Sequence, residues 1–337
     1  MLKRRGTARI MNERTRDHLL SRRLITVVVA TSLMVGAATA LAQETQPQQQ
    51  QAEEGRFQFR ATVQAINLSV VVTDKKGRFI PDLSIEDFEV YEDNARQTID
   101  FFTSEVTPVT LLLLLDASTS VRGSVDGIKE AASNFVGKLW DGDKAIIADF
   151  NEHIRFSSYF TDDIDRLVQT IQSLYPSGWT ALYDSILYSL DKVSEAEGRK
   201  ALLVFTDGDD SRSIGQGSEA SSKDAIEGAK FSEVTIYTVG FRGQRGAGSR
   251  GVNKGFLKKL AEETGGAAFF PKGIGNLNRD FEQIQDELHS QYRLAYIPTN
   301  KEQNGEWRSI SVRIKNRDKL VVRTRQGYYA YPDQPPM

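Results

Sequence analysis

Apolar residues alternate with polar ones in the segment that begins at Phe57. The alternation falls on Phe57, Phe59, Ala61 and Val63 and, after a shift of one position, on Ile66, Leu68, Val70 and Val72. A period of two residues predicts half-buried β-strands. A turn is expected at Asp74–Gly77 and another short strand at 88–91. Residues 57–105 are therefore predicted to form short antiparallel strands, too few to close a sandwich on their own.

Residues 106–290 show a second pattern, in which apolar runs alternate with helical spacing. Val109–Leu115 is apolar almost throughout, which is typical of a strand buried on both faces of a parallel sheet. Further strands are expected at 145–150, 201–206, 234–239 and 267–270. Helices are expected at 125–140, 163–174, 181–195, 223–230, 253–264 and 276–289. This alternation predicts an α/β domain with a doubly wound, mainly parallel sheet and helices on both faces.

Alternating spacing returns after Ser290. Strands are expected at 292–298, 307–314 and 320–324, with a turn at Asn304-Gly305. Because a two-faced sheet must bury its apolar side, we expect residues 291–337 to pack with the N-terminal β segment. The two flanks of the α/β domain are then predicted to form one shared β-sandwich.

Residues 1–42 have the three parts of an export signal. Seven arginines and Lys3 precede an apolar stretch at 24–42, which ends in Ala40-Leu41-Ala42. This arrangement predicts a signal peptide that is cleaved after Ala42. An uncleaved membrane anchor is the alternative, since about 19 apolar residues nearly span a bilayer. Ser21-Arg22-Arg23 partly matches a twin-arginine motif, which leaves the export route open.

Composition narrows the class of protein further. Residues 43–56 are rich in glutamine and lack large apolar side chains, so a disordered linker is expected. The 337 residues include 43 basic and 45 acidic ones, three histidines and no cysteine, which rules out disulfides, thiol nucleophiles and cysteine-ligated metals. Without residues 1–42, which hold eight basic and two acidic residues, 35 basic and 43 acidic ones remain, a net charge of −8. No nucleic-acid partner is expected, and we expect a location in a periplasm or outside the cell, with membrane contact only through an uncleaved leader.

Oxygen-bearing side chains lie in three loops of the predicted α/β domain. Asp116, Ser118 and Ser120 come after the first strand, Thr180 precedes a helix, and Asp207 follows the strand at 201–206. Ligands of open α/β sheets bind beyond the carboxyl ends of the strands, so these side chains are expected to meet at one edge. Hard oxygen donors suit Mg²⁺ or Mn²⁺. Each group also has an ordinary alternative, since such residues make turns and cap helices.

The donor set predicts a binding device. The hydroxyls of Ser118, Ser120 and Thr180 would hold the cation directly, and Asp116 and Asp207 would hold it through water. Few direct carboxylates leave the cation electron-poor, with a position open to an acidic group from outside. We expect Trp179, Asp209 and Asp210 to line the rim at which that ligand arrives.

The Asp116–Ser120 motif DASTS, the Thr180 loop and the TDG sequence at 206–208 resemble the metal-ion-dependent adhesion site of von Willebrand factor type A domains. The order and spacing of the three parts agree, over about residues 106–290. The flanks VVTDKKGRFIPDLSIEDFEVYED and SQYRLAYIPTN resemble the exported bacterial VWFA-related proteins. The resemblance implies a metal-dependent binding domain set in a β framework. Thr119 and Trp179 depart from the usual pattern, without removing a ligand.

The leading hypothesis is therefore an exported, non-catalytic protein that binds an Asp or Glu side chain of a protein partner through Mg²⁺ or Mn²⁺. One alternative is a structural component of the cell envelope in which the metal serves stability alone. Another is a metal-assisted hydrolase, which is disfavoured because the predicted edge offers no evident general base, second metal or activated nucleophile.

Overall fold

The computed structural model describes residues 65–241, 252–317 and 319–332, which belong to one compact unit. The predicted leader, the linker and the strand expected around 57–63 lie outside the described residues. Within the described ranges, no helix combines the length and the apolar character needed to cross a membrane.

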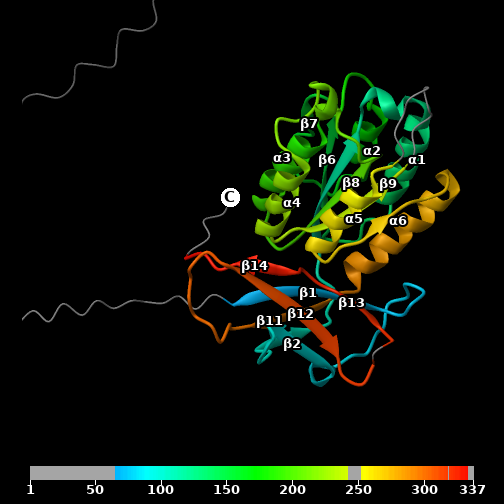
Figure 1. Cartoon of the computed structure of the whole chain (residues 1–337). Helices are drawn as coiled ribbons and strands as arrows, with labels where there is room; N and C mark the ends of the chain where they lie inside the picture. The colour runs from blue at the N-terminus through cyan, green and yellow to red at the C-terminus, as the bar shows by residue number, and fades with distance from the viewer. Residues whose placement is uncertain (1–64, 242–251, 318, 333–337) are drawn as a thin grey trace, which may run out of the picture. The chain divides into compact units, whose positions relative to one another are not determined.

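A sheet of six strands in the order β10-β9-β8-β5-β6-β7 forms the centre of the α/β domain (Figure 1). Its strands are β5 (Val109–Asp116), β6 (Lys144–Phe150), β7 (Ile154–Phe156), β8 (Arg199–Thr206), β9 (Thr235–Gly240) and β10 (Ala268–Phe269). All neighbours pair in parallel except β7, which runs antiparallel to β6 at the edge. The predicted fold class is confirmed, although β7 was not predicted, because three residues are too few to show a period.

Helices cover both faces of this sheet (Figure 1). They are α1 (Val125–Val136), α2 (Ile164–Gln172), α3 (Leu182–Ser194), α4 (Ser222–Phe231), α5 (Lys254–Glu263) and α6 (Ile274–His289). Short 3₁₀ helices span Ile85–Asp87 (η1), Thr119–Ser124 (η2) and Ser211–Ile214 (η3). The prediction that α1 extends to residue 140 was wrong: the helix ends at Val136, because Gly137 is a poor helix former and a turn at 141–142 follows.

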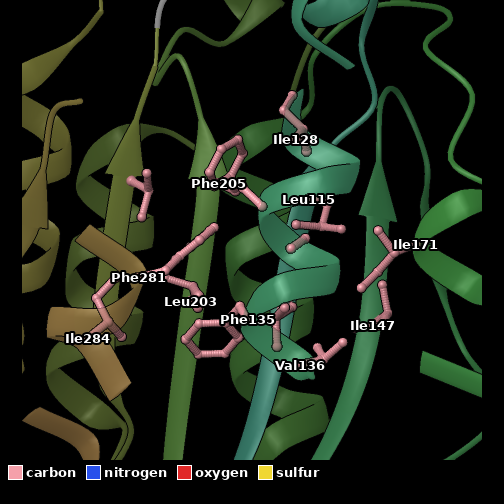
Figure 2. Close-up of a cluster of buried hydrophobic side chains, with 14 of the residues drawn as sticks. Leu115, Ile128, Phe135, Val136, Ile147, Ile171, Leu203, Phe205, Phe281 and Ile284 are labelled. Carbon is pink, nitrogen blue, oxygen red and sulfur yellow. The ribbon is translucent and has the colours of Figure 1, made fainter. Parts of the chain in front are cut away.

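The apolar run of β5 supplies two cores at once, because successive side chains of a strand point to opposite faces. Leu111, Leu113 and Leu115 pack with residues of α1, α2 and α6. Leu112 and Leu114 pack with residues of α3, α4 and α5 on the other face. Figure 2 shows the first core, where Leu115 lies among Ile128 of α1 and Phe205 of β8. Burial on both faces fixes the register of β5, and with it the position of Asp116 at its end.

The two flanks of the α/β domain build two four-stranded antiparallel sheets, in the orders β13-β1-β11-β4 and β14-β12-β2-β3. The N-terminal flank supplies β1 (Ile66–Thr73), β2 (Phe88–Glu92), β3 (Ala95–Gln97) and β4 (Phe101–Thr103). The C-terminal flank supplies β11 (Tyr292–Tyr296), β12 (Trp307–Ile314), β13 (Val321–Arg323) and β14 (Gly327–Tyr329). Both sheets contribute to one core, in which Val70 of β1, Val90 of β2 and Val312 of β12 are buried. The flanks therefore form a sandwich together, as their patterns predicted.

Candidate metal site

Two of the loops that carry predicted site residues begin at the ends of neighbouring central strands, β5 and β8. Asp116 is the last residue of β5, and Thr206 is the last residue of β8. The two strands pair in parallel from Val109 opposite Arg199 to Leu115 opposite Phe205, so their carboxyl ends reach the same edge of the sheet. The loops that follow, 117–120 after β5 and 207–210 after β8, leave this edge side by side.

Asp116 is completely buried, and both of its carboxylate oxygens accept hydrogen bonds. One carboxylate oxygen accepts the backbone N–H of Ser118 at 2.9 Å, which shapes the turn after β5. The other oxygen accepts the hydroxyl of Thr206 at 2.7 Å. The Thr206 oxygen accepts in turn the N–H of Gly208 at 3.1 Å, which positions the loop after β8. Thr206 is thus a positioning residue that was noted in the sequence only as part of a motif.

A chain of polar contacts links Asp116 to Asp207 across the edge. The hydroxyls of Ser118 and Ser120 lie 2.9 Å apart, and the Ser120 side chain hydrogen-bonds to the Asp207 carboxylate. Burial, together with the charge of Asp207, raises the pKa of Asp116 from 3.8 to about 7. Burial also raises the pKa of Asp207. Four of the five predicted ligands therefore converge, and two carboxylates among them are poorly stabilised as anions by the protein alone.

Thr180 belongs to a loop that is tied to both neighbouring loops. The N–H and the hydroxyl of Thr119 both donate to the carbonyl of Gly178, at 3.1 and 2.9 Å. On the other side, Thr180 donates its N–H to the Ser211 hydroxyl at 3.0 Å and accepts the Ser211 N–H at 2.9 Å. Thr180 does not cap the following helix, because α3 starts at Leu182 with Ala181 at its N-cap. The buried Thr180 is thus held beside the DASTS turn by its backbone.

Sequence reasoning missed Glu152, whose carboxylate lies at the rim beside Trp179. Trp179 is 49% exposed, and its backbone N–H donates to the Glu152 carboxylate at 2.6 Å. Gly178 has a φ of +71°, and a Cβ there would lie 1.7 Å from a Glu152 carboxylate oxygen, so only glycine allows this approach. Glu152 follows β6 at the same edge of the sheet, which was the available signal.

The acidic residues after Asp207 differ in what surrounds them. Asp210 accepts the N–H of Arg212 and the N–H of Ser218 on one oxygen, and the hydroxyl of Ser218 on the other. It is therefore built into the loop rather than displayed at the rim. The N–H of Asp209 donates to Asp207 at 3.1 Å, which places Asp209 beside the predicted ligand.

The donors present fit a hard cation such as Mg²⁺ or Mn²⁺ better than a softer one such as Zn²⁺. No cluster of three or more histidine, cysteine or carboxylate side chains that could hold a metal occurs in the part of the chain that the structure describes. The convergent set instead contains two carboxylates, Asp116 and Asp207, with hydroxyls between them. Hydroxyl and carboxylate oxygens suit Mg²⁺ and Mn²⁺. A divalent cation would also compensate the repulsion between the carboxylates of the buried Asp116 and the half-buried Asp207.

A doubly wound sheet that presents such a hydroxyl-rich turn at its carboxyl edge defines an α/β binding domain. The chain belongs to the von Willebrand factor type A domain family, whose family model matches residues 110–287. Domains of this family are typically binding modules that mediate contacts between proteins. No match was found among curated proteins.

Several solved structures are similar to this chain at low identity. A von Willebrand factor type A protein from Catenulispora acidiphila is 13% identical with a TM-score of 0.46, over 81% of this chain and 74% of that one. An aerotolerance-related membrane protein from Bacteroides fragilis is 16% identical with a TM-score of 0.42, over 53% of this chain and 98% of that one. The manganese-loaded TRAP protein from Plasmodium vivax is 13% identical with a TM-score of 0.41, over 71% and 98%. Likenesses of this degree concern the fold alone.

Proposed function

We propose that this protein is an exported, non-catalytic binding protein that grips an acidic side chain of a protein partner through Mg²⁺ or Mn²⁺. The observation that carries the proposal is the convergence of Asp116, Ser118, Ser120 and Asp207 in one polar network at the carboxyl edge of the sheet. Family membership supports a binding role, because domains of this type are typically binding modules.

The residues divide into direct ligands and charge-supplying ones. Ser118, Ser120 and Thr180 offer neutral hydroxyls for direct coordination. Asp116 and Asp207 supply negative charge behind them, and Thr206 holds the Asp116 carboxylate in place. The bound cation would supply positive charge to an incoming carboxylate. Because the direct ligands are neutral, that charge stays available to the partner.

The rim fits a protein partner. Trp179 is half exposed next to Thr180, and Tyr175 in the same loop is 72% exposed. Exposed aromatic side chains are frequent anchors in protein interfaces. An acidic side chain that reaches the cation would bring its neighbours against these two rings.

The location is part of the proposal. Residues 1–42 are taken as an export leader and residues 43–56 as a linker, which places the binding domain in the periplasm or outside the cell.

A carboxylate of known structure can stand in for the partner in the first test. Mn²⁺ binding is measured by electron paramagnetic resonance, and glutarate is then added with glutaramide as the uncharged control. We expect about one Mn²⁺ per chain, and glutarate binding only when the metal is present. Glutarate binding that is equal with and without a chelator would contradict the proposal.

Two variants make the test specific. Asp116→Ala removes the buried carboxylate and is expected to abolish both Mn²⁺ and glutarate binding. Asp191→Ala removes an exposed carboxylate on α3, away from the site, and is expected to behave as the wild type. Metal and glutarate binding that survive in Asp116→Ala would place the metal elsewhere.

A further inference from the structure

A second site candidate lies at the opposite ends of the same strands. A cavity of about 190 Å³ is lined by the starts of β5, β8 and β9, at Val109, Arg199 and Thr235, and by residues of β1 and β11. Its wall is therefore built by the α/β domain and by the sandwich together. The candidate metal site is at the carboxyl ends of β5 and β8, so the two sites share no residue.

The lining of this junction cavity is strongly basic. It contains two acidic residues, Glu233 and Glu263, and five basic ones, which are Arg199, Lys200, Lys230, Arg293 and Arg325. Lys230 is paired with Glu227 at 3.0 Å, and Glu263 is paired with Lys259 at 2.5 Å. Four cations and a single carboxylate therefore remain to face the cavity.

Two of the arginines are partly buried among neutral acceptors. Arg199 donates to the carbonyls of Thr107 and Leu288 and to the side chain of Gln291. Arg325 donates to the carbonyls of Gly327 and Lys230. Burial lowers the pKa of both guanidinium groups, and for Arg199 the nearby Arg293 adds to the effect. Such positive charge away from bulk water favours the arrival of an anion.

Arg293 has donors to spare. It lies on β11 opposite Ser69 of β1 and Thr103 of β4. Among the described residues, its guanidinium makes no hydrogen bond and no ion pair, although it lines the cavity. A planar guanidinium presents a fork of donors that matches the oxygens of phosphate and carboxylate groups.

The size of the cavity limits the ligand. Liquid water occupies about 30 Å³ per molecule, so the cavity offers the room of a few waters. A phosphate ion or a four-carbon dicarboxylate fits such a space.

We propose that the junction cavity binds a small oxyanion with two negative charges, of the phosphate or short dicarboxylate class, through Arg199, Arg293 and Arg325. Because both the α/β domain and the sandwich supply these arginines, the anion stabilises the junction between them. This inference does not depend on the proposed metal-dependent function.

The test measures thermal unfolding of the full chain with EDTA, so that no metal site contributes. Sodium phosphate and sodium succinate are titrated separately, against sodium chloride at equal ionic strength. We expect phosphate, succinate or both to raise the Tm in a saturable way, while chloride does not. If both dianions act only as chloride does, the proposal is overturned; which of the two acts identifies the class.

Variants at Arg293 locate the effect without removing a bond from the described structure. Arg293→Gln is expected to weaken the apparent affinity for the active dianion at least tenfold, and Arg293→Lys is expected to weaken it less. Arg317→Gln removes the same charge from an exposed position outside the cavity and is expected to match the wild type. Wild-type affinity in Arg293→Gln would overturn the proposal.

Discussion

Asp116 holds a charge that its surroundings oppose. The carboxylate is fully buried, and burial together with the charge of Asp207 outweighs the hydrogen bonds from Ser118 and Thr206 that support it. In a metal-free protein such a group takes up a proton more readily than it does in the unfolded chain. A divalent cation bound at the proposed site would compensate this charge.

The unfolding free energy of the metal-free protein should therefore depend on pH through Asp116. Because the folded pKa of Asp116 is raised from 3.8 to about 7, the stabilisation it contributes is complete below about pH 4 and is lost as the pH rises through 7. Through this group the unfolding free energy changes with pH by at most about 1.4 kcal/mol per pH unit. Unfolding in EDTA from pH 5 to 8.5 should show the wild type losing stability relative to Asp116→Asn. Parallel curves for the two proteins would refute this account of Asp116.

Sequence reasoning at this scale found residues that carry oxygen donors but not the residues that hold them. The spacing of DASTS and the position of Asp207 after a strand were visible in the sequence. The roles of Glu152 and Ser211 were not, because both reach the Thr180 loop only through tertiary contacts across 27 and 31 residues. Asp210 was expected at the rim, yet its carboxylate is used by loop N–H groups.

At the scale of elements, a buried carboxylate ties α6 to the central sheet. Asp143, just before β6, accepts the N–H of Val109 and the N–H of Trp140, each at 2.9 Å. It also lies 2.9 Å from the Nε2 of His289, the last residue of α6. Burial raises the pKa of Asp143, but these hydrogen bonds outweigh burial and lower it. The starts of β5 and β6 and the end of α6 are thus fixed at one point.

Removal of the Asp143 carboxylate should destabilise the folded protein. Asp143→Ala leaves the N–H groups of Val109 and Trp140 and the buried ring of His289 without their partner, and is expected to lower the unfolding free energy by about 3–5 kcal/mol. Asp141→Ala, two residues away and exposed, should change it by less than about 0.5 kcal/mol. Denaturant unfolding of the two variants at pH 7 measures both values. Equal stabilities would show that α6 is held by its apolar contacts alone.

Helices and strands were predicted correctly where the segment is long enough to show a hydrophobic period. The strand expected at 307–314 has those bounds in the structure, and each expected helix was found within a few residues of its ends. The three-residue strands β3, β4, β7 and β14 were not predicted, because three residues are too few to show a period. The partner of β4 is the distant β11, and local pattern carries no information on such a pairing.

At the scale of the whole molecule, neither flank of the α/β domain completes a sheet alone. β11 lies between β1 and β4, and β12 lies between β14 and β2. The strands β11 and β12 therefore supply the hydrogen-bond partners of strands that are about 200 residues earlier. The prediction of a shared sandwich rested on the shortage of strands in the N-terminal segment, and the structure gives the pairing that pattern could not.

Deletion of residues 291–337 should therefore unfold the N-terminal flank as well. Without β11 and β12, the apolar faces of β1 and β2 lose their partners and become exposed. We expect amides of 66–72 and 88–92 to exchange with solvent freely, and those of β5 and β8 to stay protected. Hydrogen exchange read by mass spectrometry distinguishes the regions. Protection that persists in 66–72 would mean that the N-terminal strands fold independently.

The central claim is that the carboxyl edge of the sheet is a cation site built around Asp116. Its most direct test is thermal unfolding of the protein in EDTA, in Mg²⁺ and in Mn²⁺, beside Asp116→Ala. We predict a saturable rise in Tm with either cation for the wild type and none for the variant. An equal rise in both proteins, or no rise in the wild type at millimolar cation, would contradict the account.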